Sequence, residues 1–225
     1  MAGGLVPDRN EAAAGGHGLV IRPYTADDDL VAAVRADGRA RARIYRGREP
    51  AVVLGRGSRP DIELRVDPCL ADQVPVYRRR GGGCAVVLDP GNLILVAAVP
   101  LPGLGRVREA MDRCTDWTLG LLVRCGITGI ARRGICDLAI GERKIGGASL
   151  HRASGLVTYG TTLLVEPDLE RVERYLEHPP REPEYRRGRA HREFMGSLAA
   201  SGAWSHGPER LRDRIVQEIE PPELN

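Results

Sequence analysis

The stretch "RRRGGGCAVVLDPGNL", residues 78–93, places three arginines directly before three glycines and an apolar run. Glycine lets another molecule approach the backbone closely, and exposed N–H groups in such a loop can bind an anion. Arginine adds permanently charged donors that suit phosphate or carboxylate. The apolar run 85–88 predicts a strand that anchors the loop. The stretch matches neither the P-loop nor the dinucleotide fingerprint. It therefore indicates either a loop that binds an anionic ligand or a solvated basic turn.

The composition is that of an ordinary globular protein, with 42% apolar and 28% charged residues. The net charge of +3 is too small to favour nucleic-acid binding. The N-terminus has no apolar signal-peptide core, and no apolar run reaches the length of a membrane span, so we expect neither secretion nor a membrane partner. The five cysteines have no CxxC spacing, which favours a reduced, cytoplasmic protein without a zinc site.

Hydrophobic periodicity predicts short strands that are joined mainly by hairpin-like turns. Strands are expected over 19–24, 42–45, 51–54, 74–77, 85–88, 93–99, 127–131, 137–140, 143–148 and 156–165. Helices are expected over 107–125, 168–177 and 208–219. This succession predicts an α+β fold with antiparallel or mixed sheets packed with a few helices. We expect a flexible N-terminal tail over 1–17 and a single domain over 18–225.

A second informative stretch is "CDLAIGERKIGGASL", residues 136–150. The Gly-Glu pair at 141–142 lies between two alternating runs and predicts a two-residue hairpin turn. In that register Asp137 faces Gly146, and Asp137 and Lys144 are diagonal neighbours on one face of the hairpin. The residues between them are small, which predicts the floor of a ligand site. The alternative interpretation is an exposed surface ion pair.

Together these stretches resemble the lipoate–protein ligase A family, within the biotin/lipoate ligase and octanoyltransferase superfamily. Three segments carry the resemblance in the family's order, namely 50–60 ("PAVVLGRGSRP"), 76–92 and 136–150. Weaker matches follow at 158–165 and 185–198. The resemblance implies a biotin/lipoate ligase-like catalytic domain.

Members of this family bind lipoate and ATP with Mg²⁺, form lipoyl-adenylate, and pass the acyl group to a lysine of a lipoyl domain or a glycine-cleavage H-protein. The resemblance therefore implies an ATP-dependent lipoate–protein ligase that acts on lipoate or octanoate. Only about 25 residues follow residue 200. The C-terminal accessory domain of many lipoate ligases is therefore expected to be missing or supplied as a separate accessory subunit.

The resemblance also implies roles for individual residues. Lys144 matches the family's essential lysine, whose ammonium would stabilise charge on the acyl carbonyl and the α-phosphate. Asp137 matches a carboxylate that helps to hold Mg²⁺ or orients the nucleotide and the incoming lysine. The other ligand-binding positions that the resemblance implies are Arg78, Arg79, Gly81, Gly82, Gly83, Cys84, Ala85, Asp89, Asn92, Gly146, Gly147, Ala148, Gly160 and Thr161.

The chain departs from the family pattern at several positions. Gly81 replaces a serine, Cys84 a glycine and Cys136 an asparagine, whereas Leu88 and Tyr159 replace histidines and are expected to alter the polarity of the site. One alternative is an octanoyl or lipoyl transferase that uses an acyl-carrier donor and a cysteine thioester, although neither thioester position of the related transferases holds a cysteine here. Free cysteines are more often small buried hydrophobes. Another alternative is a non-catalytic partner subunit that binds lipoate.

Overall fold

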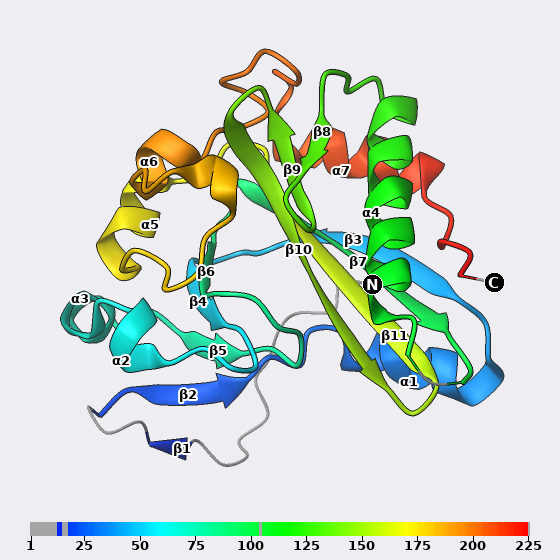
Figure 1. Cartoon of the computed structure of the whole chain (residues 1–225), viewed down its shortest axis with the longest axis horizontal. Helices are drawn as coiled ribbons and strands as arrows, with labels where there is room; N and C mark the ends of the chain where they lie inside the picture. The colour runs from blue at the N-terminus through cyan, green and yellow to red at the C-terminus, as the bar shows by residue number, and fades with distance from the viewer. Residues whose placement is uncertain (1–12, 15–17, 104, 225) are drawn as a thin grey trace.

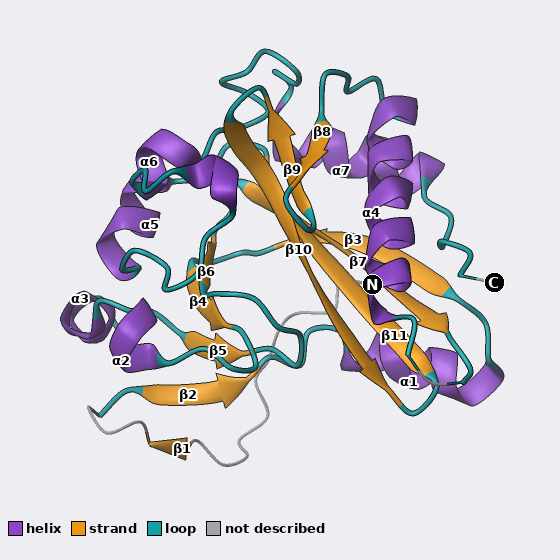
Figure 2. Ribbon diagram, viewed as in Figure 1, coloured by secondary structure: helices purple, strands orange, loops and turns teal. Residues whose placement is uncertain are grey.

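The computed structural model describes residues 13–14, 18–103 and 105–224 of the chain (Figure 1). Two β-sheets form the framework, and helices surround them (Figure 2). The smaller sheet has the strand order β1 (Ala13–Ala14), β2 (Val20–Pro23), β5 (Val76–Arg78), β4 (Ala51–Leu54) and β6 (Val86–Leu88). The larger sheet has the order β3 (Arg41–Arg46), β7 (Asn92–Pro100), β11 (Leu156–Leu164), β10 (Arg143–Ala153), β9 (Asp137–Ile140) and β8 (Ala131–Arg133).

The larger sheet is antiparallel throughout, whereas β5 of the smaller sheet runs parallel to both β2 and β4. Strand β7 of the larger sheet is an almost unbroken run of apolar residues, because both of its faces are covered. On one face Val96 packs with residues of α1 (Asp28–Asp37), and on the other Ala97 packs with residues of α4 (Val107–Arg124). The mixed α+β fold class is confirmed.

Helix α4 and the last helix, α7 (Gly207–Glu218), complete the main core. Leu121 and Leu122 of α4 meet Leu211 and Ile215 of α7 in one buried cluster with the larger sheet. Both helices agree with the sequence prediction, because each presents an apolar stripe over three or more turns.

The shorter helices lie beside the smaller sheet, where α5 contacts β6 and α6 (Figure 1). They are α2 (Pro60–Glu63), α3 (Val66–Ala71), α5 (Leu169–Tyr175), the 3₁₀ turn η1 (Glu184–Arg186) and α6 (His191–Phe194). Of these, only α5 was predicted, because the others are too short to show a helical period. The side chain of Asp168 accepts hydrogen bonds from the N–H groups of Glu170 and Arg171 at the start of α5.

Two sequence predictions differ from the structure. The strand expected over 127–131 is wrong: Ile127 is fully buried after α4, where its N–H donates to the Leu122 carbonyl, and β8 begins only at Ala131. Of the tail expected over 1–17, Ala13–Ala14 form β1 on the edge of the smaller sheet, and the other residues lie outside the described ones.

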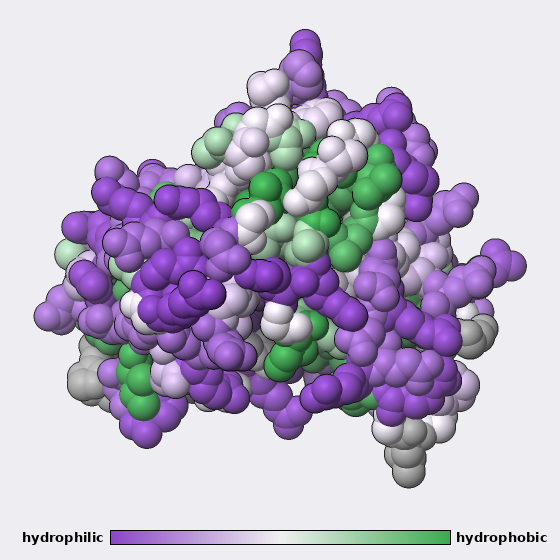
Figure 3. Space-filling view, turned by 45° about the horizontal axis from the view of Figure 1, so that its top comes forward, coloured by the Kyte–Doolittle hydropathy of each residue, from purple (hydrophilic) through white to green (hydrophobic). Residues whose placement is uncertain are grey.

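The surface is mainly hydrophilic, and hydrophobic residues gather in a limited area of the face that Figure 3 shows. Several large apolar side chains are exposed one by one, among them Val123 and Ile135. Single exposed apolar residues of this kind are normal for a folded protein. Within residues 13–14, 18–103 and 105–224, none of the helices has the length and apolar character that crossing a membrane requires.

Candidate functional site

The hairpin of β9 and β10 brings one cation and one anion into direct contact. Lys144 Nζ lies 2.7 Å from Asp137 Oδ1, and the two side chains are 28% and 13% exposed. The backbone of Lys144 is held on both sides, because it pairs with Ala139 and its carbonyl accepts from the Gly196 N–H at 2.8 Å. The chain has 33 Lys and Arg residues, and Lys144 is the only lysine among them.

A β-bulge beside this pair changes the register that the sequence predicted. The structure pairs Asp137 with Gly147 instead of Gly146, because the register shifts between Lys144 and Gly146. The extra residue, Ile145, is fully buried in the main core. A Cβ atom on Gly147 would lie 2.8 Å from Lys144 Nζ, so glycine provides the space that the ammonium occupies.

The glycine loop 81–83 reaches the same face of the sheet. Gly147 and Ser149 of β10 pair with Thr162 and Gly160 of β11, so their side-chain positions share one face, which we call the site face. A Cβ atom on Gly81 would lie 2.9 Å from Ser149 Oγ, whereas one on Gly160 would meet no atom within 4 Å. Gly147 and Ser149 are two residues, or about 7 Å, apart along the strand. Lys144 and the glycine loop therefore lie together, beside open space.

Three positions that the resemblance implied as ligand contacts point to the other face. Ala148 and Thr161 lie on the α4 side of the sheet together with Tyr159, and so does Gly146 after the bulge. Thr161 is 1% exposed and donates to the Gly147 carbonyl, and Tyr159 forms a hydrogen bond of 3.2 Å with Thr118 of α4. Strand alternation is the physical reason. The replacement of a family histidine by Tyr159 therefore does not change the polarity of the site face.

The side chains of Arg78 and Arg79 donate hydrogen bonds to backbone carbonyls. The Arg79 guanidinium donates to the carbonyls of Gly82 at 2.7 Å and Cys84 at 2.9 Å, and burial lowers its pKa to about 10. Arg78 donates to the Ser58 carbonyl at 2.9 Å. That either arginine also supplies charge to a ligand stays a prediction. Arg79 fixes the conformation of the glycine loop, and Arg78 fixes the turn at 55–58.

Glu63, at the end of α2, holds the segment that follows the glycine loop. The sequence analysis did not identify this residue. Its Oε2 accepts from the Ala85 N–H at 2.6 Å and from Ser58 Oγ at 3.0 Å, and its Oε1 accepts from the Arg59 N–H. The carboxylate is only 5% exposed. Gly83, which precedes the clamped segment, has a φ of +91° that favours glycine. A single Glu in a four-residue helix gives no sequence pattern by which this role could be found.

Asp89 and Asn92 build the turn between β6 and β7. Asp89 is 2% exposed and accepts from the N–H groups of Gly91 at 2.6 Å and Asp168 at 3.0 Å. Asn92 is fully buried and donates to the Val87 carbonyl at 3.4 Å. These contacts support the strand that carries the loop. A direct contact of either residue with a ligand stays a prediction.

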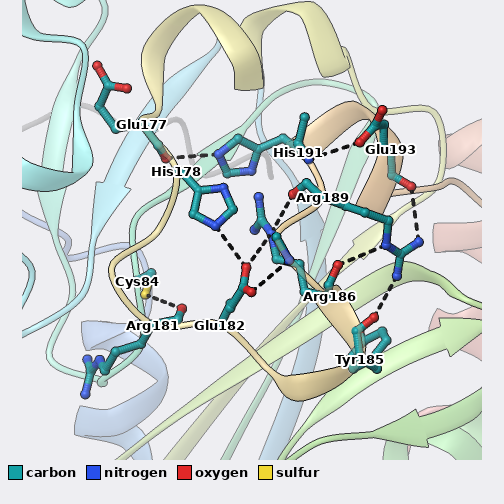
Figure 4. Close-up of polar contacts among 12 residues, drawn as sticks. Cys84, Glu177, His178, Arg181, Glu182, Tyr185, Arg186, Arg189, His191 and Glu193 are labelled. Carbon is teal, nitrogen blue, oxygen red and sulfur yellow. Dashed lines mark hydrogen bonds and ion pairs between the residues drawn. The ribbon is translucent and has the colours of Figure 1, made fainter.

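The segment 181–189, which connects α5 to α6, touches both halves of the site. Cys84 Sγ lies 3.7 Å from the Arg181 carbonyl on the loop side, and Tyr185 Oη donates to Asp137 Oδ2 at 3.0 Å on the hairpin side. Figure 4 shows how the segment folds on itself, with the Glu182 carboxylate between His178 and Arg186. The resemblance covered part of this segment but gave Tyr185 no role.

Both cysteines near the site are free thiols, and Cys136 is poorly suited to act as a nucleophile. Cys136 donates to the Ala148 carbonyl at 3.3 Å, and burial raises the pKa of its thiol. A thioester mechanism needs the thiolate form, which burial disfavours. Cys114 and Cys125 lie in the core at α4, as their positions on its apolar stripe predicted.

The residues fit a metal ion only as part of a nucleotide complex. Across 13–14, 18–103 and 105–224, no three His, Cys, Asp or Glu side chains are grouped so that they could hold an ion. Asp137 is a single carboxylate, and its two oxygens contact Lys144 and Tyr185. Mg²⁺ is commonly bound by one or two carboxylates together with substrate phosphates. Asp137 therefore fits one ligand of an ion that arrives with a nucleotide.

Comparison with known proteins gives the family and the fold of the chain. The chain matches the family described as the lipoyl protein ligase A/B catalytic domain over residues 22–220. A lipoate–protein ligase of Streptococcus pyogenes is 28% identical over 150 residues, which cover 67% of this chain but only 43% of that relative. The chain thus spans less than half the length of that protein.

Two solved structures share the fold. A crystal structure of lipoate-protein ligase A bound with ATP matches with a TM-score of 0.69 and 18% identity, over 85% of this chain and 76% of that one. A structure of a bipartite lipoate protein ligase and its E2 lipoyl domain from Thermoplasma acidophilum matches with a TM-score of 0.70 and 20% identity, over 89% and 80%. With the family match spanning nearly its whole length, the chain belongs to the lipoyl protein ligase A/B catalytic domain family.

Proposed function

We propose that the protein is an ATP-dependent lipoate–protein ligase, which activates lipoate or octanoate as the acyl-adenylate and transfers the acyl group to a lysine of an acceptor protein. The observation that supports this most is the meeting of the Lys144 ammonium and the glycine loop on one face of β10. Family membership and the ATP-bound neighbour support the same reaction class.

In the first step a carboxylate oxygen of the fatty acid attacks the α-phosphorus of ATP, and pyrophosphate leaves. Negative charge on the phosphate and acyl oxygens needs donors that are already in place. Lys144 supplies them, because an ammonium carries three N–H groups and among the described residues only Asp137 pairs with it. Mg²⁺, when bound with the nucleotide, would neutralise phosphate charge beside Asp137.

In the second step the amine of an acceptor lysine attacks the acyl carbon, the bond to the adenylate oxygen breaks, AMP leaves, and the amine releases its proton to solvent. The acceptor is of the lipoyl-domain or H-protein kind. The Thermoplasma neighbour, which is described together with an E2 lipoyl domain, supports the lipoyl domain. Its bipartite form supports a separate accessory subunit as a further partner. A neutral acceptor amine is the nucleophile, so Lys144 acts only as a donor of hydrogen bonds.

The test is a reaction of the protein with lipoate, MgATP and an apo lipoyl domain, followed by mass spectrometry of the acceptor. We expect a mass gain of one lipoyl group on one lysine and a stoichiometric release of AMP. A Lys144→Ala variant should remain folded and give no gain. Absence of the gain with wild-type protein, even after a candidate accessory subunit is added, would contradict the proposal.

The same assay separates the acyl-carrier alternatives. Transfer from octanoyl acyl carrier protein without ATP would instead establish a transferase, and its loss on thiol alkylation would implicate Cys84 or Cys136. The burial and raised pKa of the Cys136 thiol argue against that result. Binding of lipoate without turnover would identify a partner subunit.

A further inference from the structure

The carboxylate of Asp137 is held from two directions. Its Oδ1 contacts Lys144 Nζ at 2.7 Å, and its Oδ2 accepts from the hydroxyl of Tyr185 at 3.0 Å. A carboxylate that is bound through one oxygen can still rotate about its Cβ–Cγ bond. A second hydrogen bond to the other oxygen removes that freedom, so Tyr185 decides which way Asp137 presents its charge to Lys144.

Tyr185 is itself fixed by its neighbours. Its ring lies beneath the Arg133 guanidinium, at 5.2 Å, and against the ring of Phe194, at 5.0 Å. Burial and the neighbouring Asp137 carboxylate both raise the pKa of the Tyr185 hydroxyl. The hydroxyl therefore stays protonated and remains a donor throughout the neutral range.

The segment that carries Tyr185 is docked on the hairpin at a second point. Arg189 Nη2 donates to the Glu142 carbonyl at 3.1 Å and to the Tyr185 carbonyl at 2.8 Å, as Figure 4 shows for the second contact. Within the segment, Glu182 accepts from the Gly188 N–H at 2.9 Å. These contacts place the Tyr185 hydroxyl from outside the hairpin, with little freedom of its own.

We propose that Tyr185 is a positioning residue of the reaction, which acts through Asp137 to aim the Lys144 ammonium at the site face. This rests on the proposed ligase function for its catalytic consequence, but its structural part can be measured without it. Removal of the hydroxyl should leave Asp137 free to rotate and Lys144 loosely held.

The chain provides a matched control. Tyr175 donates to Asp72 Oδ2 at 2.8 Å, and Asp72 is paired with Arg174, so the same three kinds of group meet away from Lys144. Tyr175→Phe removes the same hydroxyl from the same kind of acceptor. It therefore reproduces the general effect of the substitution on stability but leaves Asp137 untouched.

The first measurement follows the reactivity of Lys144. Because it is the only lysine, labelling with acetic anhydride and peptide mass spectrometry report on this single side chain. An ion-paired ammonium must leave its partner before it reacts, so we expect Tyr185→Phe to speed labelling about three- to tenfold and Tyr175→Phe to leave it unchanged. Equal rates in wild type and Tyr185→Phe would overturn the proposal.

The second measurement is the ligase assay. We expect Tyr185→Phe to lower kcat about tenfold with KM for lipoate within about twofold of wild type, because the donor is misaligned while the binding face is intact. Tyr175→Phe should keep both constants. If wild-type protein shows no ligation, the proposed function fails, and the labelling result still decides whether Tyr185 positions Lys144.

A second variant guards against misfolding of Tyr185→Phe. Arg133→Gln keeps the hydroxyl but removes the cation above the ring, so labelling of Lys144 should rise less than in Tyr185→Phe and in the same direction. Circular dichroism shows whether each variant is folded. If Tyr185→Phe is unfolded and folded Arg133→Gln shows no change in the labelling rate of Lys144, the result contradicts the proposal.

Discussion

Asp137 and Asp72 each bind one basic side chain and one tyrosine hydroxyl, yet the two clusters differ in what remains available. At Asp72 the guanidinium of Arg174 binds both carboxylate oxygens, at 2.5 and 2.7 Å, and Tyr175 adds a third bond. At Asp137 the single contact of Lys144 Nζ leaves two of its N–H groups without a partner among the described residues.

Open space does not by itself distinguish the two clusters. A hollow of about 500 Å³ adjoins Asp72 and is lined in part by Arg171 and Arg174. The Asp137 cluster is distinguished by its cation. The Lys144 ammonium is a compact charge on a flexible side chain, and Gly147 leaves space beside it. The two-bond contact of Arg174 with Asp72 is structural, because both carboxylate oxygens are occupied. The single contact of Lys144 with Asp137 leaves N–H groups that can bind a ligand.

The largest expected effect comes from making the Asp137 cluster resemble the Asp72 cluster. Lys144→Arg retains the charge and allows a two-bond fork with Asp137, as Arg174 forms with Asp72. We expect ligation to fall about 10²- to 10³-fold, the usual size for loss of a placed donor, because the fork draws the guanidinium to the carboxylate. Acceptor mass spectrometry measures it. The ligation rate of Arg174→Lys should stay within about twofold of wild type. A Lys144→Arg enzyme with wild-type activity would contradict this distinction between the two clusters.

The next test fills the space beneath the ammonium. A methyl group on Gly147 would lie 2.8 Å from Lys144 Nζ and 3.3 Å from Asp137 Oδ1, so Gly147→Ala should displace the flexible lysine. We expect about a tenfold loss of kcat, since a small misplacement of a reacting group has a large kinetic effect. Gly120→Ala in α4 is the control: it meets only an ordinary contact and should raise stability by about 0.5–1 kcal/mol.

A third test concerns the glycine loop, which has no counterpart at Asp72. In Glu63→Gln one acceptor oxygen becomes a donor, and either choice deprives a backbone N–H, of Ala85 or of Arg59, of its partner. A buried unsatisfied donor costs about 1–3 kcal/mol, so urea unfolding should show a loss of this size. If the stability and the lipoate affinity of Glu63→Gln both equal those of wild type, the hydrogen bonds of Glu63 are not needed to hold the glycine loop.

The smallest effect is the pH dependence of the Asp72 cluster. Hydrogen bonds from Arg174 and Tyr175 lower the pKa of Asp72 to about 2, below its usual value of about 3.9 in an unfolded chain. The cluster therefore stabilises the fold above about pH 4, and that contribution is lost as the pH falls toward 2. Urea unfolding should show wild type more stable than Asp72→Asn at pH 5, with the difference shrinking by pH 3. A constant difference would contradict this assignment.

The sequence predicted α4, α7 and most strands because their patterns extend over several turns or alternations, but it missed the ten-residue helix α1. Helix α4 and strands β4, β9 and β11 lie within a few residues of their predicted bounds. The hairpin turn also follows from local chemistry, since Gly141 has a φ of +58°. The short helices α2, α3 and α6 carried no such pattern.

The candidate site was predicted in part. The motifs placed the glycine loop and Lys144 near one another through the family resemblance, but a bulge of one residue moved the partner of Asp137 from Gly146 to Gly147. A bulge reverses the alternation of side chains beyond it, and for this reason Gly146, which was expected opposite Asp137, lies on the other face. The anchoring role of Arg78 depends on the Ser58 carbonyl, 20 residues away in the sequence, and no local pattern contains it.

By itself the sequence determined the α+β class, the hairpin and the residue types that meet at the site, because periodicity and turn chemistry are local properties of a chain. Only the tertiary structure decided that Lys144 has spare donors, that Glu63 holds the loop, and that Tyr185 reaches Asp137 from 48 residues away. Contacts at that separation are set by packing of the two sheets and by one bulge in β10, and a short stretch of sequence contains neither.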